Sequence, residues 1–319
     1  MSHSVDSSLT HGTRSIPALG RDLAQVGLGT FRPNALSDAT GSRLLERFIE
    51  LGGAVVDTAA MYGDGESERV IGRWMRSSGA RESVVLVVKG GYPDKDGTSR
   101  VNPESLRREL EGSLERLGTD HVDVFMPHTD DASVPAGEIV DCLDDMIRAG
   151  LALSAGASNW TIERLGEAAV YGSVHGKTSF GCSSVQWSLA ERVTPYLSMN
   201  IGGRDEASAD WYAHTGLPVL AWSSLAAGFL GQDDEPERDA KGPYDSPANR
   251  ERRRRAAELG RELGYSAVQV ALAWVMRQKA RPFVLIGPGS IEHLDELWNA
   301  SGLALTPEQV GWLDLEPRD

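Results

Sequence analysis

The chain has 319 residues, of which 40% are hydrophobic and 24% are charged. These proportions are those of an ordinary soluble protein with a substantial core, and we expect one domain over residues 1–319. The net charge of −14 argues against nucleic acid or an anionic membrane surface as a partner, because both would repel the chain.

The N-terminus lacks the order of charged and apolar residues that is typical of a signal peptide, and no apolar run reaches 18 residues. We therefore expect a cytoplasmic protein in which residues 1–20 form a flexible or poorly ordered segment. Cys142 and Cys182 lie far apart in apolar patterns, so we expect both to be buried and neither to form a disulfide or a metal site.

Short apolar runs recur along the chain, mostly at intervals of about 30 to 40 residues, which is typical of a strand-loop-helix-loop unit. The expected strands are Ala24–Leu28, Ala54–Val56, Val84–Val88, Val122–Met126, Leu151–Ala155, Cys182–Val185, Pro218–Ala221 and Phe283–Ile286.

Helical patterns separate these runs. Asn102 and Pro103 open a helix that Gly118 ends, and Ser67 is expected to cap the helix after the second strand. Capping boxes open two later helices, at Ser266–Gln269 and Thr306–Gln309. Strands and helices that alternate over eight units predict an α/β protein that is a single (β/α)8 TIM barrel, with a long loop after the seventh strand.

The run "RERRRR" over residues 250–255 has two interpretations. It could bind phosphate or nucleic acid, or it could be the solvated face of a helix with Glu251, Glu258 and Glu262 as balancing charges. We favour the solvated helix, because the chain as a whole is acidic.

Reactive side chains follow several strands directly: Asp57, Lys89 and His128, with Tyr62 five residues after Asp57. In a closed parallel barrel the carboxyl ends of the strands open on one face, so these groups become neighbours. A tyrosine normally titrates near pKa ~10, and an adjacent ammonium favours its phenolate. We interpret Tyr62 as a proton donor, Lys89 as the group that tunes it, Asp57 as the anchor of Lys89, and His128 as a group that orients a carbonyl oxygen.

Two other kinds of site are not indicated. The seven histidines form no HxH or HxxxH pair, so no metal site is expected, and no G-x-S-x-G sequence indicates a serine hydrolase.

Several motifs resemble those of the aldo-keto reductase superfamily, in the order of that family, over about residues 24 to 300. They are "GLGTF", "VVDTAAMYGDGESERVIG", "VVLVVKGG", "LERLGTDHVDVFMPHTDD", "GASNW", "SSVQWSLAE", "VLAWSSLAAGFL" and "VLIGPGS". The resemblance implies reduction of a carbonyl group by hydride transfer from a nicotinamide cofactor, with Asp57, Tyr62, Lys89 and His128 as the catalytic residues.

The resemblance also assigns residues to the cofactor. Ser158, Asn159 and Gln186 match positions that orient the nicotinamide carboxamide, and Trp222 matches the aromatic residue on which the nicotinamide ring stacks. The complete set of expected cofactor positions is Gly29, Thr30, Asp57, Ser158, Asn159, Gln186, Trp222, Ser223, Leu225, Gly228, Gly287, Gly289, Ser290, His293 and Glu296.

Two positions depart from the family pattern. Gly289 stands where a cation for the 2′-phosphate is usual, so NADP(H) is favoured from the family and NAD(H) is a competitor, while Ser290 and His293 at a helix N-terminus could still bind phosphate. Pro127 precedes His128, and this could change the angle at which the imidazole enters the site.

The substrate is a small aldehyde, ketone or keto-sugar in this interpretation, with an aromatic pocket wall expected from Phe31, Tyr92, Trp160 and Trp187. Two other functions use the same fold. A nicotinamide-binding regulatory subunit would not need all four catalytic groups. A lyase or isomerase without a redox step would not need the Asn159, Gln186 and Trp222 set. The sequence indicates no oligomeric state.

Overall fold

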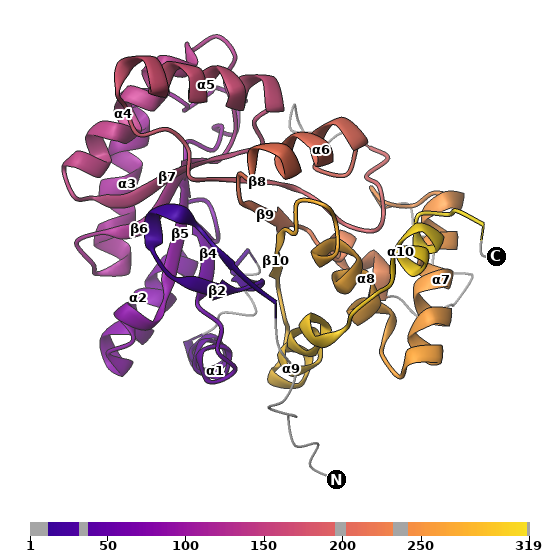
Figure 1. Cartoon of the computed structure of the whole chain (residues 1–319). Helices are drawn as coiled ribbons and strands as arrows, with labels where there is room; N and C mark the ends of the chain where they lie inside the picture. Colours follow the sequence, from indigo (N-terminus) through magenta and orange to yellow (C-terminus); the bar gives the residue numbers. More distant parts are fainter. Residues whose placement is uncertain (1–11, 32–37, 195–201, 232–241, 318–319) are drawn as a thin grey trace.

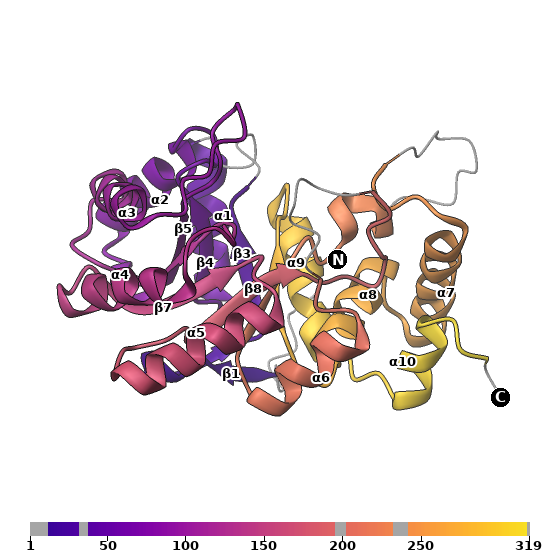
Figure 2. The same cartoon turned by 90° about the horizontal axis from the view of Figure 1, so that it is seen from above.

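A closed barrel of parallel strands forms the centre of the molecule, and helices surround it (Figures 1 and 2). The computed structural model describes residues 12–31, 38–194, 202–231 and 242–317. The strands follow one another around the barrel in chain order, and the last pairs with the first. They are β3 (Val26–Gly29), β4 (Val55–Ala59), β5 (Val85–Gly90), β6 (Val122–Pro127), β7 (Ala152–Ser158), β8 (Cys182–Gln186), β9 (Val219–Trp222) and β10 (Phe283–Ile286). The (β/α)8 prediction is confirmed.

The helices pack on the outside of the barrel. They are α1 (Asp38–Glu50), α2 (Glu66–Ser78), α3 (Pro103–Leu117), α4 (Ala136–Arg148), α5 (Ile162–His175), α6 (Glu206–Thr215), α7 (Pro247–Leu263), α8 (Ala267–Met276), α9 (Ile291–Asn299) and α10 (Pro307–Leu313). Short 3-10 turns also occur at η1 (Pro17–Leu19), η3 (Arg81–Ser83), η4 (Ala226–Gly231) and η5 (Ala300–Gly302). None of the helices in the described segments is long and apolar enough to cross a membrane.

A hairpin takes in the last part of residues 1–20, the segment that was expected to be flexible or poorly ordered. β1 (Thr13–Ser15) pairs with β2 (Asp22–Ala24), and this hairpin lies across one end of the barrel (Figure 1). Ile16 and Leu23 are buried against side chains from inside the barrel, such as Val85 and Phe283. Burial of apolar surface therefore orders this segment. Residues 1–11 lie outside the described part of the chain.

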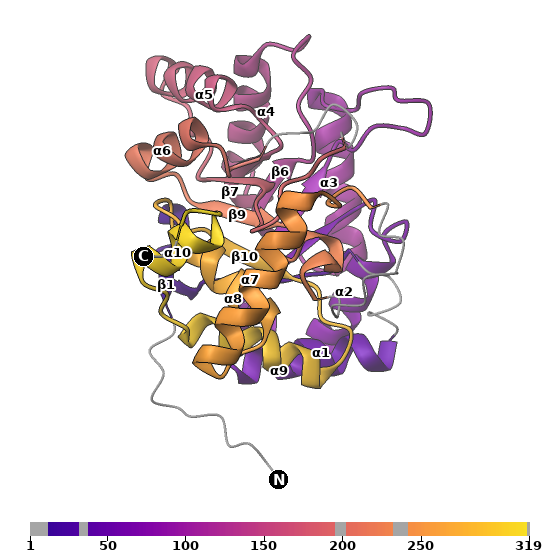
Figure 3. The same ribbon diagram turned by 90° about the vertical axis from the view of Figure 1, so that its right-hand side faces the viewer.

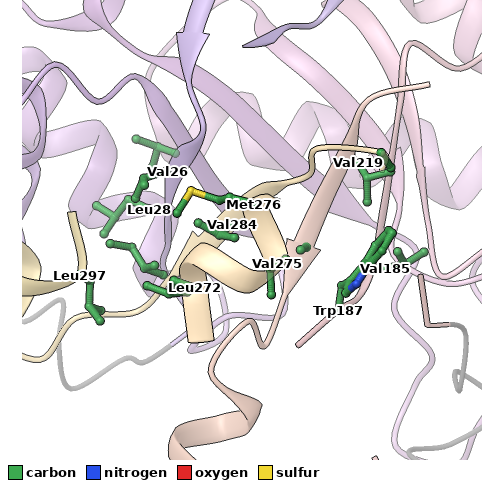
Figure 4. Packing of buried hydrophobic residues seen from close by; sticks show 14 of the residues in the cluster. Val26, Leu28, Val185, Trp187, Val219, Leu272, Val275, Met276, Val284 and Leu297 are labelled. Atoms are coloured by element: carbon green, nitrogen blue, oxygen red, sulfur yellow. The ribbon is translucent and has the colours of Figure 1, made fainter. Parts of the chain in front are cut away.

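A second hydrophobic core lies between the barrel and its helices. Figure 4 shows Leu272, Val275 and Met276 of α8 among side chains of the barrel strands, including Val26 and Val284. All five are at most 4% exposed, and this burial explains why α8 is apolar at every position except Gln269.

The helix ends agree with the sequence signals in most places. The Asn102 side chain accepts a hydrogen bond from the backbone N–H of Ser105, and Gly118 ends α3 with a left-handed φ of 66°. Both predicted capping boxes are present. The prediction for Ser67 was wrong: Gly65 is the N-cap of α2, and the Ser67 hydroxyl donates to the backbone oxygen of Thr30, 2.9 Å away.

The arginine run lies on α7, which packs beside α8 (Figure 3). Arg254 pairs with Glu251 and Glu258, as the solvated interpretation predicts. Arg252 differs, because it is 7% exposed and its guanidinium contacts Glu191 at 2.8 Å.

Both cysteines were expected to be buried. Cys182 is buried, whereas Cys142 is only half-buried, and both are free thiols. The long connection after the seventh barrel strand runs from β9 through η4 to α7, and residues 232–241 within it are outside the described residues.

Candidate active site

The carboxyl ends of three neighbouring strands bring the expected catalytic groups together. Asp57 lies in β4, Lys89 in β5, and His128 directly after β6, and each is at most 8% exposed. Lys89 donates to the carboxylate of Asp57, and its Nζ lies 3.4 Å from the Tyr62 hydroxyl. We call these four residues the Tyr62 cluster.

The loop after β4 turns Tyr62 back toward Lys89. The Tyr62 backbone N–H donates to Ala59 at 3.0 Å, and the three residues after Tyr62 all have left-handed backbone. Two of them are Gly63 and Gly65, which adopt this conformation at no steric cost. The glycines are therefore explained by a tight reversal that places the phenol over the barrel mouth.

His128 faces Tyr62, with 5.7 Å between the ring centroids. Its backbone N–H donates to Gly90 at 2.7 Å, so Pro127 leaves the histidine fixed to β5. Burial, and then the charge of Lys89, lower the pKa of His128 well below its usual value. The imidazole is therefore neutral near pH 7, and no described residue forms a hydrogen bond to its buried Nδ1.

Two opposing effects act on the pKa of Asp57 in its buried ion pair with Lys89. Burial raises the pKa of the Asp57 carboxyl, and the bonded Lys89 ammonium opposes that rise. Removal of either charge would leave the other buried without its partner.

Asn159 is the centre of a second cluster beside His128. Its side-chain amide donates to the backbone oxygen of His128 and to the Ser158 hydroxyl, both at 3.0 Å, and accepts from the Trp222 indole at 3.1 Å. Asn159 has a left-handed φ of 61°, which asparagine tolerates better than most residues. Gln186 pairs with Trp222 in the sheet and donates to Ser188 at 2.9 Å. The expected carboxamide positions thus form one hydrogen-bonded group with Trp222.

The segment after β9 has an unusual backbone. Ser223, Ala226 and Ala227 have left-handed φ values of 51°, 53° and 54°, and Gly228 has φ 92°. Left-handed backbone in non-glycine residues costs energy and is found most often at functional sites. Leu225 accepts the Gly228 N–H and so stabilises the turn.

The last group of expected cofactor positions lies at the start of α9. The Ser290 hydroxyl caps the helix through the His293 N–H, and the His293 ring accepts the N–H of Gly289 at 3.3 Å. A side chain at Gly289 would meet no atom within 4 Å. Glu296, one turn later, accepts from Gln269 through its backbone oxygen.

The remaining expected cofactor positions, Gly29, Thr30 and Gly287, lie at or just after the ends of β3 and β10. Gly29 pairs with Asp57, and Thr30 donates through both its hydroxyl and its N–H to the Asp57 backbone oxygen. Gly287 lies opposite: a Cβ there would be 3.9 Å from the Gly29 oxygen.

Only two of the four expected substrate aromatics lie at the mouth. Phe31 is 58% exposed and meets Tyr62 edge-on at 5.1 Å, and Tyr92 meets His128 edge-on at 5.0 Å. The structure does not bring Trp160 and Trp187 to them, because both are completely buried. The Trp160 indole donates to the Thr129 oxygen, and Trp187 packs in the outer core.

Ser184 is a site residue that was not predicted from the sequence. This residue is completely buried, its backbone oxygen accepts the N–H of Asn159, and no described residue forms a hydrogen bond to its hydroxyl. Alternation along β8 turns Cys182, Ser184 and Gln186 to the same side of the strand, which is the signal that could have identified it. An unpartnered hydroxyl beside Asn159 fits a polar ligand such as a carboxamide.

Comparisons with known proteins agree with this arrangement. The model of the aldo/keto reductase family matches residues 25–315. The uncharacterized oxidoreductase YrpG of Bacillus subtilis is 31% identical over 92% of each chain. An aryl-alcohol dehydrogenase [NADP(+)] of Phanerodontia chrysosporium is 26% identical, over 93% of this chain and 80% of its own length.

The fold has a counterpart with a bound cofactor. A crystal structure of an aldo-keto reductase from Klebsiella pneumoniae in complex with NADPH superposes with a TM-score of 0.71 and 26% identity, and covers 93% of this chain and 92% of its own. The chain belongs to the aldo/keto reductase family of NAD(P)H-dependent oxidoreductases.

Proposed function

We propose that the protein reduces a small aromatic aldehyde or ketone with NADPH, and that Tyr62 donates the proton to the carbonyl oxygen. The observation that carries this proposal is the Lys89 ammonium, which bonds to Asp57 and lies 3.4 Å from the Tyr62 hydroxyl beside a neutral His128. A regulatory subunit would need only the nucleotide site, so the complete cluster favours turnover.

The proposed mechanism divides the proton chemistry among the cluster. When Tyr62 gives its proton to the oxygen, the phenolate that remains is stabilised by the adjacent ammonium, and Asp57 keeps that ammonium charged and in place. The neutral His128 orients the carbonyl oxygen by hydrogen bonding, because a buried uncharged imidazole carries one N–H. The bound nicotinamide would supply the hydride to the carbonyl carbon.

The residues present fit such a cofactor. Asn159, Ser158 and the Ser184 hydroxyl, to which no residue in the described part of the chain bonds, offer donors and acceptors for a carboxamide. The partly exposed Trp222 offers a flat surface for a ring. For the preference of NADP(H) over NAD(H), the support is the N-terminus of α9 with Ser290 and His293, which suits a phosphate. The family neighbour from Klebsiella was crystallised with NADPH.

An aromatic substrate is favoured by the edge-on aromatic rings at the mouth. Phe31, Tyr62, His128 and Tyr92 contact one another in series, and Phe31 leaves more than half of its surface exposed. The relative from Phanerodontia is named an aryl-alcohol dehydrogenase.

The test is the rate of reduction of a panel of carbonyl compounds with each cofactor, measured as the change in nicotinamide absorbance. Aryl aldehydes, aliphatic aldehydes and keto-sugars are compared with NADPH and with NADH. Tyr62→Phe should abolish turnover and leave nucleotide affinity almost unchanged, while Tyr265→Phe, between α7 and α8, serves as the matched control. Turnover above about a tenth of wild type in Tyr62→Phe would refute the assignment of the acid. Nucleotide binding without turnover of any carbonyl would favour the regulatory alternative, and no nucleotide binding would favour a lyase or isomerase.

A further inference from the structure

The loop between β5 and α3 carries Tyr92 to the barrel mouth. It comprises residues 91–100, which form neither helix nor strand, and residues 94–98 within it are exposed. The Tyr92 ring meets the His128 ring edge-on, with 5.0 Å between the centroids. Because an exposed loop has little packing of its own, other contacts have to fix the place of this aromatic ring.

One buried side chain of α3 contacts both ends of the loop. The Glu109 carboxylate accepts the backbone N–H of Gly91 at 2.9 Å through one oxygen. Its other oxygen lies 2.7 Å from the guanidinium of Arg100, as an ion pair. Glu109 is only 9% exposed, so water competes little for either interaction. The two ends of the loop are therefore joined through a single carboxylate.

The loop ends also pack directly on each other at Gly91. This glycine has a left-handed φ of 76°, and a Cβ there would lie 2.9 Å from Leu106 Cδ2 and 3.3 Å from the Arg100 backbone oxygen. Both the conformation and the lack of space favour glycine. Since Tyr92 follows Gly91 directly, the direction of the Tyr92 side chain depends on how Gly91 is held.

Arg100 extends the contact from Glu109 into the exposed part of the loop. Its guanidinium also lies 3.2 Å from the Asp94 carboxylate, and the Asp94 N–H donates to the Thr98 oxygen at 3.0 Å. Burial raises the pKa of Glu109, and the Gly91 N–H and the Arg100 charge oppose that rise. These two partners thus favour the charged carboxylate, which is the form that pairs with Arg100.

The same side chain lies against the strand end to which His128 is bonded. The Gly90 oxygen accepts the His128 N–H at 2.7 Å, and a Cβ at Gly90 would lie 3.2 Å from the Cβ of Glu109. Glu109 therefore contacts the backbone beside both rings of the Tyr92–His128 pair.

We infer that Glu109 is a positioning residue for the carbonyl substrate: by bonding to both ends of residues 91–100, it holds the Tyr92 ring against His128, where an aromatic substrate packs. The inference rests on the proposed reduction of an aromatic carbonyl. Glu109 acts through Tyr92, so its loss should weaken the binding of an aromatic substrate more than it slows the chemical step.

The experiment measures kcat and the Michaelis constant for an aryl aldehyde and for propanal, which has no ring to pack on Tyr92. Glu109→Ala loses both contacts and should raise the Michaelis constant of the aryl aldehyde about tenfold, with kcat changed by less than about twofold. The Michaelis constant of propanal and the dissociation constant of NADPH should not change.

The conservative variants separate the two contacts of the carboxylate. Glu109→Gln can still accept the Gly91 N–H and should raise the Michaelis constant of the aryl aldehyde only about threefold. Arg100→Gln should have the same effect. The double variant of Arg100→Gln with Glu109→Gln should be no worse than either single variant, because both remove one interaction.

Cleavage at Lys95 measures the hold on the loop without any turnover. Lys95 is exposed within residues 91–100. A lysine-specific protease should cut after it about tenfold faster in Glu109→Ala than in the wild type, because the released loop fits a protease more readily. Mass spectrometry of the fragment that ends at residue 95 identifies this cut.

Asp144→Ala is the matched control, since Asp144 makes the same kinds of contact at the other end of the barrel. It is 1% exposed, accepts the Thr178 N–H at 3.0 Å and pairs with Arg148 at 2.7 Å. Thr178 precedes β8 and so lies on the amino side of the strands, away from the mouth. This variant should lose stability in urea unfolding and keep both Michaelis constants and the slow cut at Lys95.

Three results would overturn the inference. They are an unchanged Michaelis constant for the aryl aldehyde in Glu109→Ala, an equal rise for propanal, and an unchanged rate of cleavage at Lys95. If Glu109→Ala does not fold, the two glutamine variants decide, and additive effects in the double variant would contradict the shared contact. A wild type that reduces no carbonyl refutes the proposed function itself, whereas wild-type turnover with an unaffected Glu109→Ala refutes only the role of Glu109.

Discussion

Replacement of Lys89 by methionine tests the Tyr62 cluster most directly, because it removes the ammonium and keeps a side chain of similar length. At 3.4 Å, a unit charge attracts a phenolate by about 5 kcal/mol with an effective dielectric constant of about 20. If half of the phenolate charge has formed in the transition state, the barrier rises by about 2.5 kcal/mol, which is roughly a hundredfold loss of turnover.

The same change leaves the buried Asp57 carboxylate without its partner. We expect a loss of about 3–5 kcal/mol in the free energy of unfolding, the usual cost of breaking a buried ion pair. Loss of Lys89 also removes the interaction that opposes the raised pKa of Asp57. Because the folded Asp57 then binds its proton more tightly than the unfolded chain does, stability should fall as the pH rises from the ordinary aspartate pKa to the raised folded value.

The double variant Asp57→Asn with Lys89→Met separates catalysis from folding. Urea unfolding should show that most of the lost stability returns, since no buried charge is left unpaired, while single-turnover reduction should remain at least a hundredfold slow. A double variant that is stable and retains more than about a tenth of the wild-type rate would show that the ammonium does not support Tyr62.

Three further changes test separate parts of the structure. Gly289→Arg enters open space and should tighten NADPH by roughly 1–2 kcal/mol and leave NADH almost unchanged in a fluorescence titration; equal tightening would place Gly289 away from the 2′ position. His128 has a lowered pKa, so the folded state loses stability as the pH falls from about 6.5 toward that lower value. His128→Gln should remove this part of the pH dependence when the free energy of unfolding is measured over that range. Gly72→Ala puts a Cβ 2.5 Å from the Leu117 oxygen and should cost about 1–3 kcal/mol in unfolding, whereas Gly166→Ala, with no atom within 4 Å, should not destabilise the protein.

Strand-end residues were predictable because their neighbours follow from topology alone. Once eight parallel strands close, Asp57, Lys89 and His128 have to meet at one rim, and no side-chain detail is needed. The same reasoning fails where a side chain turns away from the barrel mouth. Trp187 directly follows Gln186, so strand alternation turns it outward into the helical layer and not into the mouth.

Residues that depend on distant partners were beyond the sequence. Arg252 belongs to a run that is indistinguishable from a solvated helix face, and its burial depends on Glu191, which approaches only in the folded chain. Serine is a common N-cap residue, so Ser67 matched the sequence signal. The N-cap is Gly65, however, and α2 begins one residue before Ser67. Asn249 is completely buried, and its side-chain amide donates to the backbone oxygens of Glu191 and Tyr244. No sequence pattern identifies such a residue, because its role depends on these distant partners.

The seam between β3 and β10 has a consequence for how the chain is made. Val26 and Val284 pair across it, and the Gln25 side chain adds hydrogen bonds to the backbone oxygens of Arg281 and Pro282. The ribosome releases β3 almost at the start of synthesis, and β10 leaves it near the end, so one edge of β3 stays unpaired for most of translation. An exposed strand edge favours association with other chains. The nascent protein is therefore most vulnerable to aggregation until β10 (Phe283–Ile286) emerges, and the long sequence separation of this pairing makes barrel closure a slow step of refolding.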